Sequence, residues 1–206
     1  MIKIFRILLL CVIAVAGFSC KGTPEAVPGV IDTIMSRRSV RKYLDAPVEH
    51  EKLAQIAFCG INAPSAMNEQ PWEVRVVEDP SFVSELTDLF VKEYPDSRSN
   101  PDFKTMFNNA PNVIFVATPE DGGLLDAGML AENIMLSAES MGLGTCCQGW
   151  TLDWLLGCED AAPYLSRLEI PEGYVLRYLI GVGYPDETPA PTSRKENKIR
   201  YILPAK

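Results

Sequence analysis

Four positive charges lie within seven residues of this sequence, in the stretch SRRSVRK at residues 36–42. The cations are Arg37, Arg38, Arg41 and Lys42, and Ser39 adds a hydroxyl donor among them. Adjacent cations repel one another unless an anion lies between them, and arginine guanidinium groups match phosphate oxygens two at a time. The stretch is therefore either a phosphate-binding segment or a solvated run of surface charge.

The composition and the absence of several motifs argue against some classes of function. The 206 residues carry 27 acidic against 19 basic side chains, a formal net charge of -8, which argues against a nucleic-acid-binding protein. The sequence lacks GxSxG, HExxH, Walker A and GxGxxG motifs and any Cys/His cluster with metal-ligand spacing. The one histidine, His50, lies among charges and is expected in solvent. These features favour a protein that binds and orients an anionic cofactor, which itself performs the reaction.

Two further segments accompany the basic stretch in a definite order. NAPSAMNEQPW is rich in Pro, Ser and Asn, and GLGTCCQGW follows a long apolar segment. Together with RRSVRKY, FNNAPNVIFVAT and LIGVGYPDETPAPTSRK, they resemble the FMN-dependent nitroreductase family over nearly the whole chain after its N-terminus. The resemblance implies an α+β fold with a helix-covered central sheet. It also implies an obligate homodimer with an exchanged C-terminal arm and an FMN site in each interface.

The resemblance assigns the cations to the cofactor. Arg37, Arg38 and Ser39 would hold the FMN phosphate and ribityl chain, and Arg194 would close on the phosphate from the tail. Arg41 would approach the pyrimidine edge of the flavin ring, where a fixed positive charge stabilises the anionic reduced form. Lys42 is expected to remain in solvent.

The resemblance also assigns residues that lie against the flavin ring. Pro64, Ser65 and Asn68 would come from the partner subunit. Gln148 and Gly149 would place their backbone near flavin N5, where a glycine leaves the approach open. No protein side chain is expected to be catalytic, because the flavin performs the chemistry.

The implied reaction passes hydride from NADH or NADPH through flavin N5 to an electron-poor small molecule such as a nitroaromatic or a quinone. Two alternatives stay open at this point. The protein could bind flavin as a carrier or sensor without turnover, or it could keep the fold without FMN.

Periodicity indicates the elements that must position these residues. Apolar residues at helical spacing predict helices over residues 30–38, 48–63 and 124–144, and another that begins at Asp79 and Pro80. Strands are predicted over residues 71–79, 112–118 and 175–185. The polar segment 93–111 is expected to be a mobile lid, and residues 186–203 an extended tail. The interleaved order favours α+β.

The first twenty residues have the charged, apolar and small-residue order of a secretory signal. They end at Cys20, as in a bacterial lipoprotein, although Phe18 makes the match loose. A plain secretory signal that is cut nearby and an N-terminal anchor that stays uncut are the alternatives. We expect a signal peptide at 1–19, lipidation of Cys20, a tether at 20–29 and the FMN-binding domain at 30–206. The protein would then be exported and held at a membrane only by its lipid, or be cytoplasmic if the segment is not a signal.

The remaining side chains of chemical interest are expected to be structural. Four cysteines are predicted to be small buried residues, with one oxidised pair left open: Cys59, Cys146, Cys147 and Cys158. Three tryptophans are expected in the core or at an interface: Trp72, Trp150 and Trp154.

Overall fold

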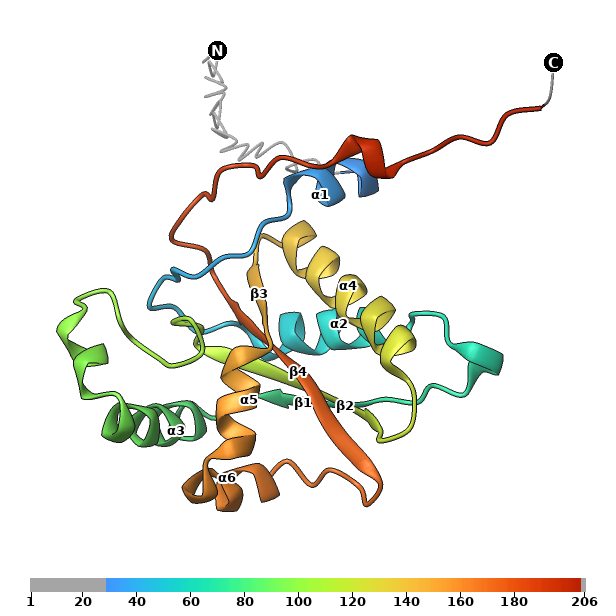
Figure 1. Ribbon diagram of the computed structural model, residues 1–206. Coiled ribbons are helices and arrows are strands. Elements are labelled where there is room, and N and C mark those ends of the chain that lie inside the picture. Colours follow the sequence, from blue (N-terminus) through green and yellow to red (C-terminus); the bar gives the residue numbers. More distant parts are fainter. Residues whose placement is uncertain (1–28, 205–206) are drawn as a thin grey trace, which may run out of the picture.

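The computed structural model describes residues 29–204, which form a four-stranded antiparallel sheet covered by helices (Figure 1). The strand order is β1-β2-β4-β3, and each neighbouring pair is antiparallel. The strands are β1 (Glu73–Val77), β2 (Asn112–Pro119), β3 (Gly144–Gln148) and β4 (Tyr174–Gly183). The helices are α1 (Val30–Ser36), α2 (His50–Ile61), α3 (Pro80–Glu93), α4 (Leu124–Ser140), α5 (Trp150–Gly157) and α6 (Ala162–Ser166). The predicted α+β class is confirmed.

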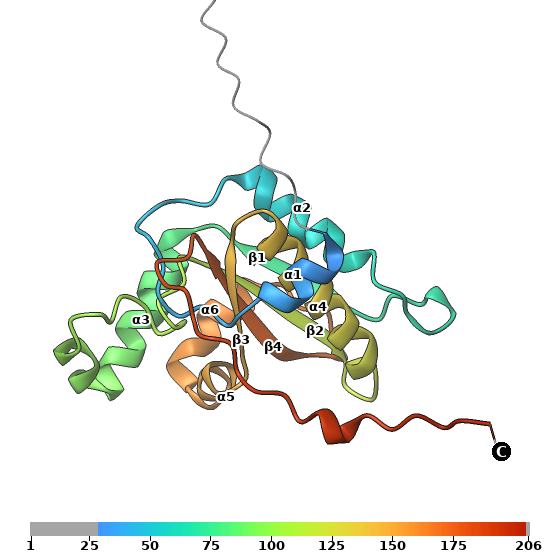
Figure 2. The ribbon, with the colours of Figure 1, turned by 90° about the horizontal axis from the view of Figure 1, so that it is seen from above.

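The sheet is buried on both faces, which explains the continuous apolar run in β2. Side chains of a strand alternate between faces, so Val113 and Phe115 enter one core while Ile114 and Val116 enter the other. Helices α3 and α5 contribute to the first core, and α2 and α4 to the second. Figure 2 shows the sheet between these two groups of helices.

Helices α2 and α4 pack closely over the second core. Leu53, Ile56 and Gly60 are the buried residues of α2, as its apolar spacing predicts. A methyl group added at Gly60 would lie 2.6 Å from Cγ1 of Ile134 in α4, so the glycine sets the separation of the helices. The pair forms a rigid support for the elements that follow α4.

Helix α3 begins as predicted, with a side-chain cap and a proline in its first turn. Asp79 accepts a hydrogen bond from the backbone N–H of Ser81 at 2.9 Å, and Pro80 follows the cap. Hydrogen bonds from Ser81 are the main cause that holds the pKa of the Asp79 carboxyl below its usual range, and the ion pair with Arg167 adds a smaller effect.

The basic stretch is fastened to the edge of the sheet. Val40 donates its N–H to the carbonyl of Thr145 in β3 at 2.9 Å, and Leu44 donates to Tyr184 after β4 at 2.9 Å. The buried Tyr43 donates its hydroxyl to the Val40 carbonyl at 2.7 Å. Its pKa is raised by burial. The chain after α1 is therefore an extended segment alongside β3.

Three predicted features need correction. Residues 144–148 form strand β3, which was not predicted, and helices α5 and α6 were not predicted either. Helix α4 ends at Ser140, and Gly142, at φ +74°, supplies the turn that follows it. In the polar segment 93–111, Met106, Phe107 and Ala110 are buried in the first core. Only the first half of that segment, with its short 3-10 helix Pro95–Ser99, can therefore act as a lid.

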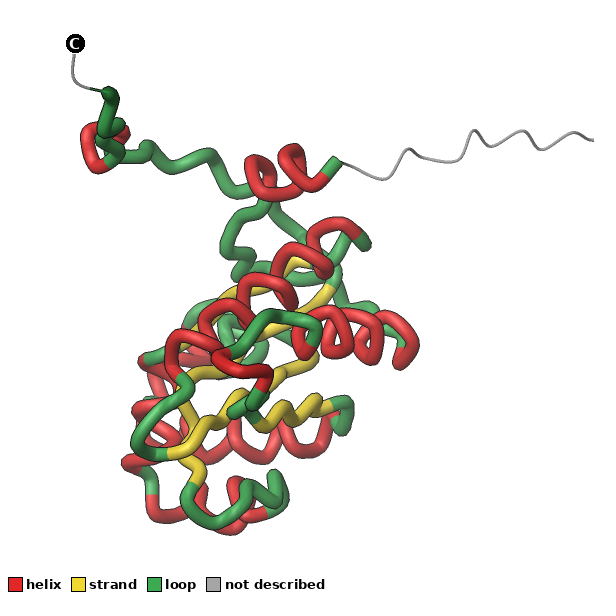
Figure 3. The backbone as a smooth tube through the Cα atoms, turned by 90° about the vertical axis from the view of Figure 1, so that its right-hand side faces the viewer, coloured by secondary structure: helices red, strands yellow, loops and turns green. Residues whose placement is uncertain are grey.

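The tail follows β4 as an exposed, extended segment that leaves the body of the protein (Figure 3), as predicted. A single chain does not test its exchange with a second subunit. The predicted signal at 1–19, the lipid site at Cys20 and most of the tether at 20–29 lie outside the described residues. Across residues 29–204, none of the helices is long and apolar enough to cross a membrane.

Substitution of Gly144 by Ala should destabilise the protein, because the new methyl would lie 2.8–2.9 Å from three side-chain carbons of Val40. Such overpacking costs about 1–3 kcal/mol of unfolding free energy, measurable in urea. The matched control is Gly128→Ala, since the exposed Gly128 of α4 has open space around it. That variant should gain about 0.5–1 kcal/mol. Equal effects at both positions would contradict the close packing of Val40 on β3.

Candidate cofactor-binding site

The basic stretch presents its cations on different sides. It runs extended, so successive side chains alternate in direction. Arg37 points to α4, where its Nε lies 4.0 Å from Oε1 of Glu132. Arg38 instead lines a cleft together with Val40. The structure thus keeps Arg37 and Arg38 in one segment but does not place their side chains in one cluster.

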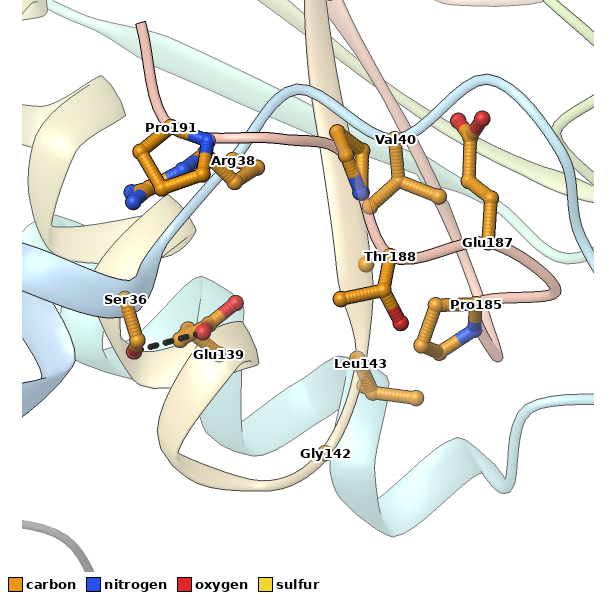
Figure 4. A pocket seen from close by; sticks show the side chains of 12 residues that line it. Ser36, Arg38, Val40, Glu139, Gly142, Leu143, Pro185, Glu187, Thr188 and Pro191 are labelled. Carbon is orange, nitrogen blue, oxygen red and sulfur yellow. Dashed lines mark hydrogen bonds between the residues drawn. The ribbon is translucent and has the colours of Figure 1, made fainter.

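The cleft beside Arg38 has a volume of about 430 Å³ (Figure 4). It lies between the basic stretch, the corner at Gly142–Gly144, and the start of the tail at 185–191. One wall also holds an acidic side chain, Glu139, which accepts a hydrogen bond from the Ser36 hydroxyl at 2.7 Å. Glu187 lines the cleft as well, so the cleft combines one guanidinium, two carboxylates and glycine backbone.

Arg38 has an unused donor. Its Nη1 donates to the carbonyls of Met35 at 2.8 Å and Arg37 at 2.7 Å. Its Nε is buried and has no hydrogen-bond partner among the described residues. Leaving a buried charged donor unsatisfied is costly, so this atom fits an anionic acceptor supplied by a ligand. The phosphate of FMN has the required chemistry.

Arg41 is held by its backbone, and its side chain stays open. The carboxylate of Glu187 accepts the N–H groups of Arg41 at 2.5 Å and Lys42 at 3.1 Å. The exposed Arg41 guanidinium makes one long bond, at 3.3 Å, to the carbonyl of Ser39. Lys42 is exposed as expected but is not free, because it pairs with Asp102 at 2.8 Å. Of these neighbours, Arg41 has the side chain that is most available to a ligand.

Gln148 and Gly149 end the strand that flanks the basic stretch. The Gln148 side chain is 3% exposed; its Nε2 donates to the Phe107 carbonyl and its Oε1 accepts from the Thr151 hydroxyl, both at 2.8 Å. These bonds commit the side chain to the core. At Gly149, in contrast, the space for a Cβ atom is empty. Any contact from this corner to a cofactor must therefore come from the backbone.

The adjacent cysteines of β3 differ in environment. Cys146 is buried, as expected, while Cys147 is exposed, which corrects the prediction that all four cysteines are buried. Partial desolvation of each thiol, the larger cause, raises the pKa of both. Cys59 and Cys158 are half-buried, and all four described cysteines are free thiols.

The loop with Pro64, Ser65 and Asn68 lies far from the basic stretch, on the opposite side of the chain in Figure 1. Met67 and Asn68 have left-handed backbones, with φ 51° and 59°, and Met67 is 93% exposed. Ser65 Oγ accepts the N–H of Gln70 at 2.9 Å and holds this conformation. Strained, exposed loops of this kind often belong to binding sites.

Arg194 makes its hydrogen bonds within the tail. Its guanidinium hydrogen-bonds the hydroxyl and carbonyl of Thr192 and the carbonyl of Ser193, all in its own tail segment. One chain therefore brings together Arg37–Arg41 and the end of β3. It leaves the 62–72 loop apart from them, and it shows no contact of Arg194 with them among the hydrogen bonds of the described residues.

Comparison with known proteins identifies the family. The Nitroreductase family profile matches residues 34–184. The chain belongs to the nitroreductase family. A nitroreductase with bound FMN from Desulfitobacterium hafniense is 27% identical, with 84% of this chain and 98% of that chain covered and a TM-score of 0.73.

Two other relatives carry flavin-related names. An FMN-dependent nitroreductase from Clostridium difficile R20291 is 29% identical, with 85% and 98% of the two chains covered and a TM-score of 0.64. An NADPH-flavin oxidoreductase from Vibrio harveyi is 27% identical over 176 residues, which cover 77% of this chain and 67% of that protein. The predicted family is confirmed, whereas the roles of the individual site residues stay predictions.

Several acidic residues that shape the site were not predicted. Glu139 and Glu187 lie in the cleft, and Asp126 of α4 accepts the N–H of Ala66 at 3.1 Å and so anchors the protruding loop. No sequence motif marks them, since each accepts a hydrogen bond from a segment far away in the chain. Of the three, only Asp126 has a positional hint, the first turn of a predicted helix.

The two cysteines of β3 should react differently with iodoacetamide. At pH 7.5 native Cys147 should be alkylated more slowly than a free thiol, because its raised pKa keeps it protonated, but faster than the buried Cys146. Mass spectrometry of peptides sampled over time measures both rates. Cys147→Ser should remove the faster of the two modifications. Equal rates at Cys146 and Cys147 would contradict their different burial.

Proposed function

We propose that the protein is an FMN-dependent oxidoreductase that passes two electrons from NADH or NADPH to an electron-poor small molecule. The unsatisfied Arg38 Nε, in an arginine-rich segment fastened beside the open Gly149 backbone, is the observation that carries the proposal. The names of the Vibrio harveyi and Clostridium difficile relatives support the donor and the cofactor. With a quinone as acceptor, NAD(P)H, H⁺ and quinone give NAD(P)⁺ and quinol.

The bound flavin would supply the redox chemistry, and the chain would bind and orient it. Arg37, Arg38 and Ser39 would hold the phosphate and ribityl chain. Arg41 would supply a fixed positive charge at the edge of the ring, which favours the reduced anion. The backbone at Gln148 and Gly149 would face the reactive part of the ring without an obstructing side chain.

A homodimer is part of this proposal. The loop with Pro64, Ser65 and Asn68 lies on the opposite side of the chain from the basic stretch (Figure 1), so a second copy would supply this loop to the flavin. Exposed apolar side chains support such an assembly: Ile31 and Met35 on α1, and Tyr201, Ile202 and Leu203 on the tail. The tail would wrap the partner subunit, where Arg194 could approach a phosphate.

The location of the protein is a second part of the proposal. The sequence of residues 1–20 supports export, with lipidation at Cys20 as the membrane anchor. Nicotinamide cofactors are scarce outside the cytoplasm, so an exported enzyme would favour a quinol as an alternative donor. The test must therefore include both kinds of donor.

The direct test is anaerobic. Purified protein loaded with FMN should be yellow, should bleach with NADH, NADPH or a quinol, and should regain colour with a quinone or a nitroaromatic. Bleaching without reoxidation by any acceptor would favour the alternative, a flavin carrier or sensor without turnover. A protein that does not take up FMN would refute both.

The same preparation tests the phosphate site. Arg37→Ala should raise the dissociation constant of FMN by about 10–150-fold, the effect of losing a charge-assisted hydrogen bond. Arg98→Ala is the matched control, because Arg98 is an exposed arginine that pairs with Asp88 in another part of the chain. Flavin fluorescence titration measures both. An unchanged affinity in Arg37→Ala would remove this residue from the site.

Mixed dimers test the sharing of each site between subunits. Arg37→Ala damages the basic stretch and Asn68→Ala the protruding loop, so each homodimer should have two weakened FMN sites. A heterodimer of the two should regain one intact site, and its other site should carry both changes. Titration of the tagged, co-purified heterodimer should show half the wild-type number of tight sites. The absence of any tight site would contradict a shared site.

A further inference from the structure

A cluster of aromatic rings lies outside the cofactor-binding residues described above. Phe90 of α3 is its centre. Its ring stacks on Tyr94, with centroids 4.8 Å apart, and packs edge-on against Trp154 at 5.2 Å and Trp150 at 6.1 Å. Trp150, which was expected in a core or an interface, is 61% exposed in the single chain. An exposed tryptophan on a packed aromatic cluster is a ready surface for a planar ligand.

A cavity of about 340 Å³ opens on this cluster. Phe90, Phe103 and Trp150 form its aromatic side, and Ser97, Asn100 and Asn108 contribute polar groups. None of the side chains that line the cavity is charged. Its volume lies within the usual range of small-molecule sites.

The cavity borders both segments that the flavin would occupy. Asn109, also in its lining, donates its amide N–H to the Arg41 carbonyl at 3.2 Å. Asn108 Nδ2 lies 3.9 Å from Sγ of Cys146 in β3. Trp150 directly follows Gly149, where the backbone is open. A molecule in the cavity would therefore lie next to the reactive side of the proposed flavin site.

Two charged side chains near the cavity, Glu93 and Lys104, are engaged elsewhere. Glu93 accepts a hydrogen bond from Trp154 Nε1 at 3.0 Å, at the rear of the aromatic cluster. Lys104 turns its Nζ to Asp45 at 2.8 Å and to the Tyr43 carbonyl at 2.9 Å. An anion entering the cavity would lose its hydration without meeting a free cation in the lining, which is strongly unfavourable.

We propose that this cavity binds the ring of the electron acceptor and selects uncharged aromatic molecules over anionic ones. Trp150 and Phe103 would contact the ring faces, and the amide of Asn108 would donate to a nitro or carbonyl oxygen. This inference rests on the proposed function, and it assigns the acceptor specificity to residues of α5 and the 97–108 segment.

A pair of acceptors of nearly equal shape tests the selectivity. 4-Nitrobenzamide is neutral and 4-nitrobenzoate is an anion, while the reducible nitro group is the same. The FMN-loaded protein with its best donor should show a kcat/KM at least about tenfold higher for the amide. Equal values, or a preference for the benzoate, would overturn the proposal.

A charge placed at the cavity should change this ratio. Ser97→Lys adds a cation to the lining, and Ser97→Met is the control of similar length without charge. The lysine variant should raise kcat/KM for the benzoate about fivefold relative to the methionine variant and leave that for the amide unchanged. If kcat/KM changed by the same factor for both acceptors, the charge selectivity could not be assigned to this cavity.

Removal of the exposed ring tests the contact itself. Trp150→Ala should lower kcat/KM for 4-nitrobenzamide about tenfold, whereas Leu156→Ala, an exposed position on the same helix outside the cavity, should not. FMN affinity should stay at the wild-type value in both variants. An unchanged kcat/KM in Trp150→Ala would overturn the role of the ring.

Calorimetric binding separates this inference from the proposed function. If the wild-type protein shows no turnover, the proposed function fails, and titration of the oxidised protein with 4-nitrobenzamide still decides the cavity. Binding that is about tenfold weaker in Trp150→Ala than in Leu156→Ala supports it. Equal binding in the two variants, or none in the wild type, overturns it.

Discussion

The attachment of the basic stretch to the edge of the sheet is the constraint on which the candidate site depends. Without the bond from Val40 to Thr145 and the contact of Val40 with Gly144, four neighbouring cations would separate by repulsion. Tyr43 adds a buried hydroxyl bonded to the Val40 carbonyl. Backbone pairing and packing, which do not depend on charge, thus hold the charges in place before any ligand binds. Such preorganisation lowers the cost of binding an anion.

Acidic side chains also help to hold the basic stretch in place. Glu187 accepts the backbone N–H groups of Arg41 and Lys42, Asp102 pairs with Lys42, and Glu132 lies 4.0 Å from Arg37. These contacts reduce repulsion within the stretch, but they leave the Arg41 guanidinium open to a ligand and the buried Arg38 Nε without a partner among the described residues. Because surface ion pairs contribute little to stability, their main effect here is on position.

Much of the fold could be predicted from the sequence, because strong local patterns match the tertiary structure. The continuous apolar run of β2 and the Asp79-Pro80 start of α3 are examples. Strand β3 was missed, since GTCCQ has little strand character of its own and forms by pairing with β4. Helix α5, with the sequence WTLDWLLG, is only eight residues long and mostly apolar, so its helical period is weak and it was missed as well.

Predictions for the site failed or stayed incomplete where contacts between residues far apart in the sequence determine the position of a side chain. The pairing of Lys42 with Asp102 joins residues sixty positions apart, and burial of Phe107 converts half of an expected lid into core. The exposure of Cys147 follows from which face of an unpredicted strand it occupies. The family resemblance indicated which segments of the chain belong to the site. The direction of each side chain could be seen only in the structure.

The residues proposed to anchor the cofactor include several cations, whereas those proposed to bind the acceptor are neutral. Cations gather along residues 37–42, where an anionic cofactor would be anchored, while the cavity beside Trp150 is lined by aromatic and uncharged polar groups. Asn109 joins the two regions through its bond to the Arg41 carbonyl. A cofactor that must stay bound benefits from strong ionic contacts, whereas an acceptor that must leave after each turnover benefits from weaker stacking and neutral hydrogen bonds. The division of charge along the chain therefore matches the different residence times that a two-step flavin reaction requires.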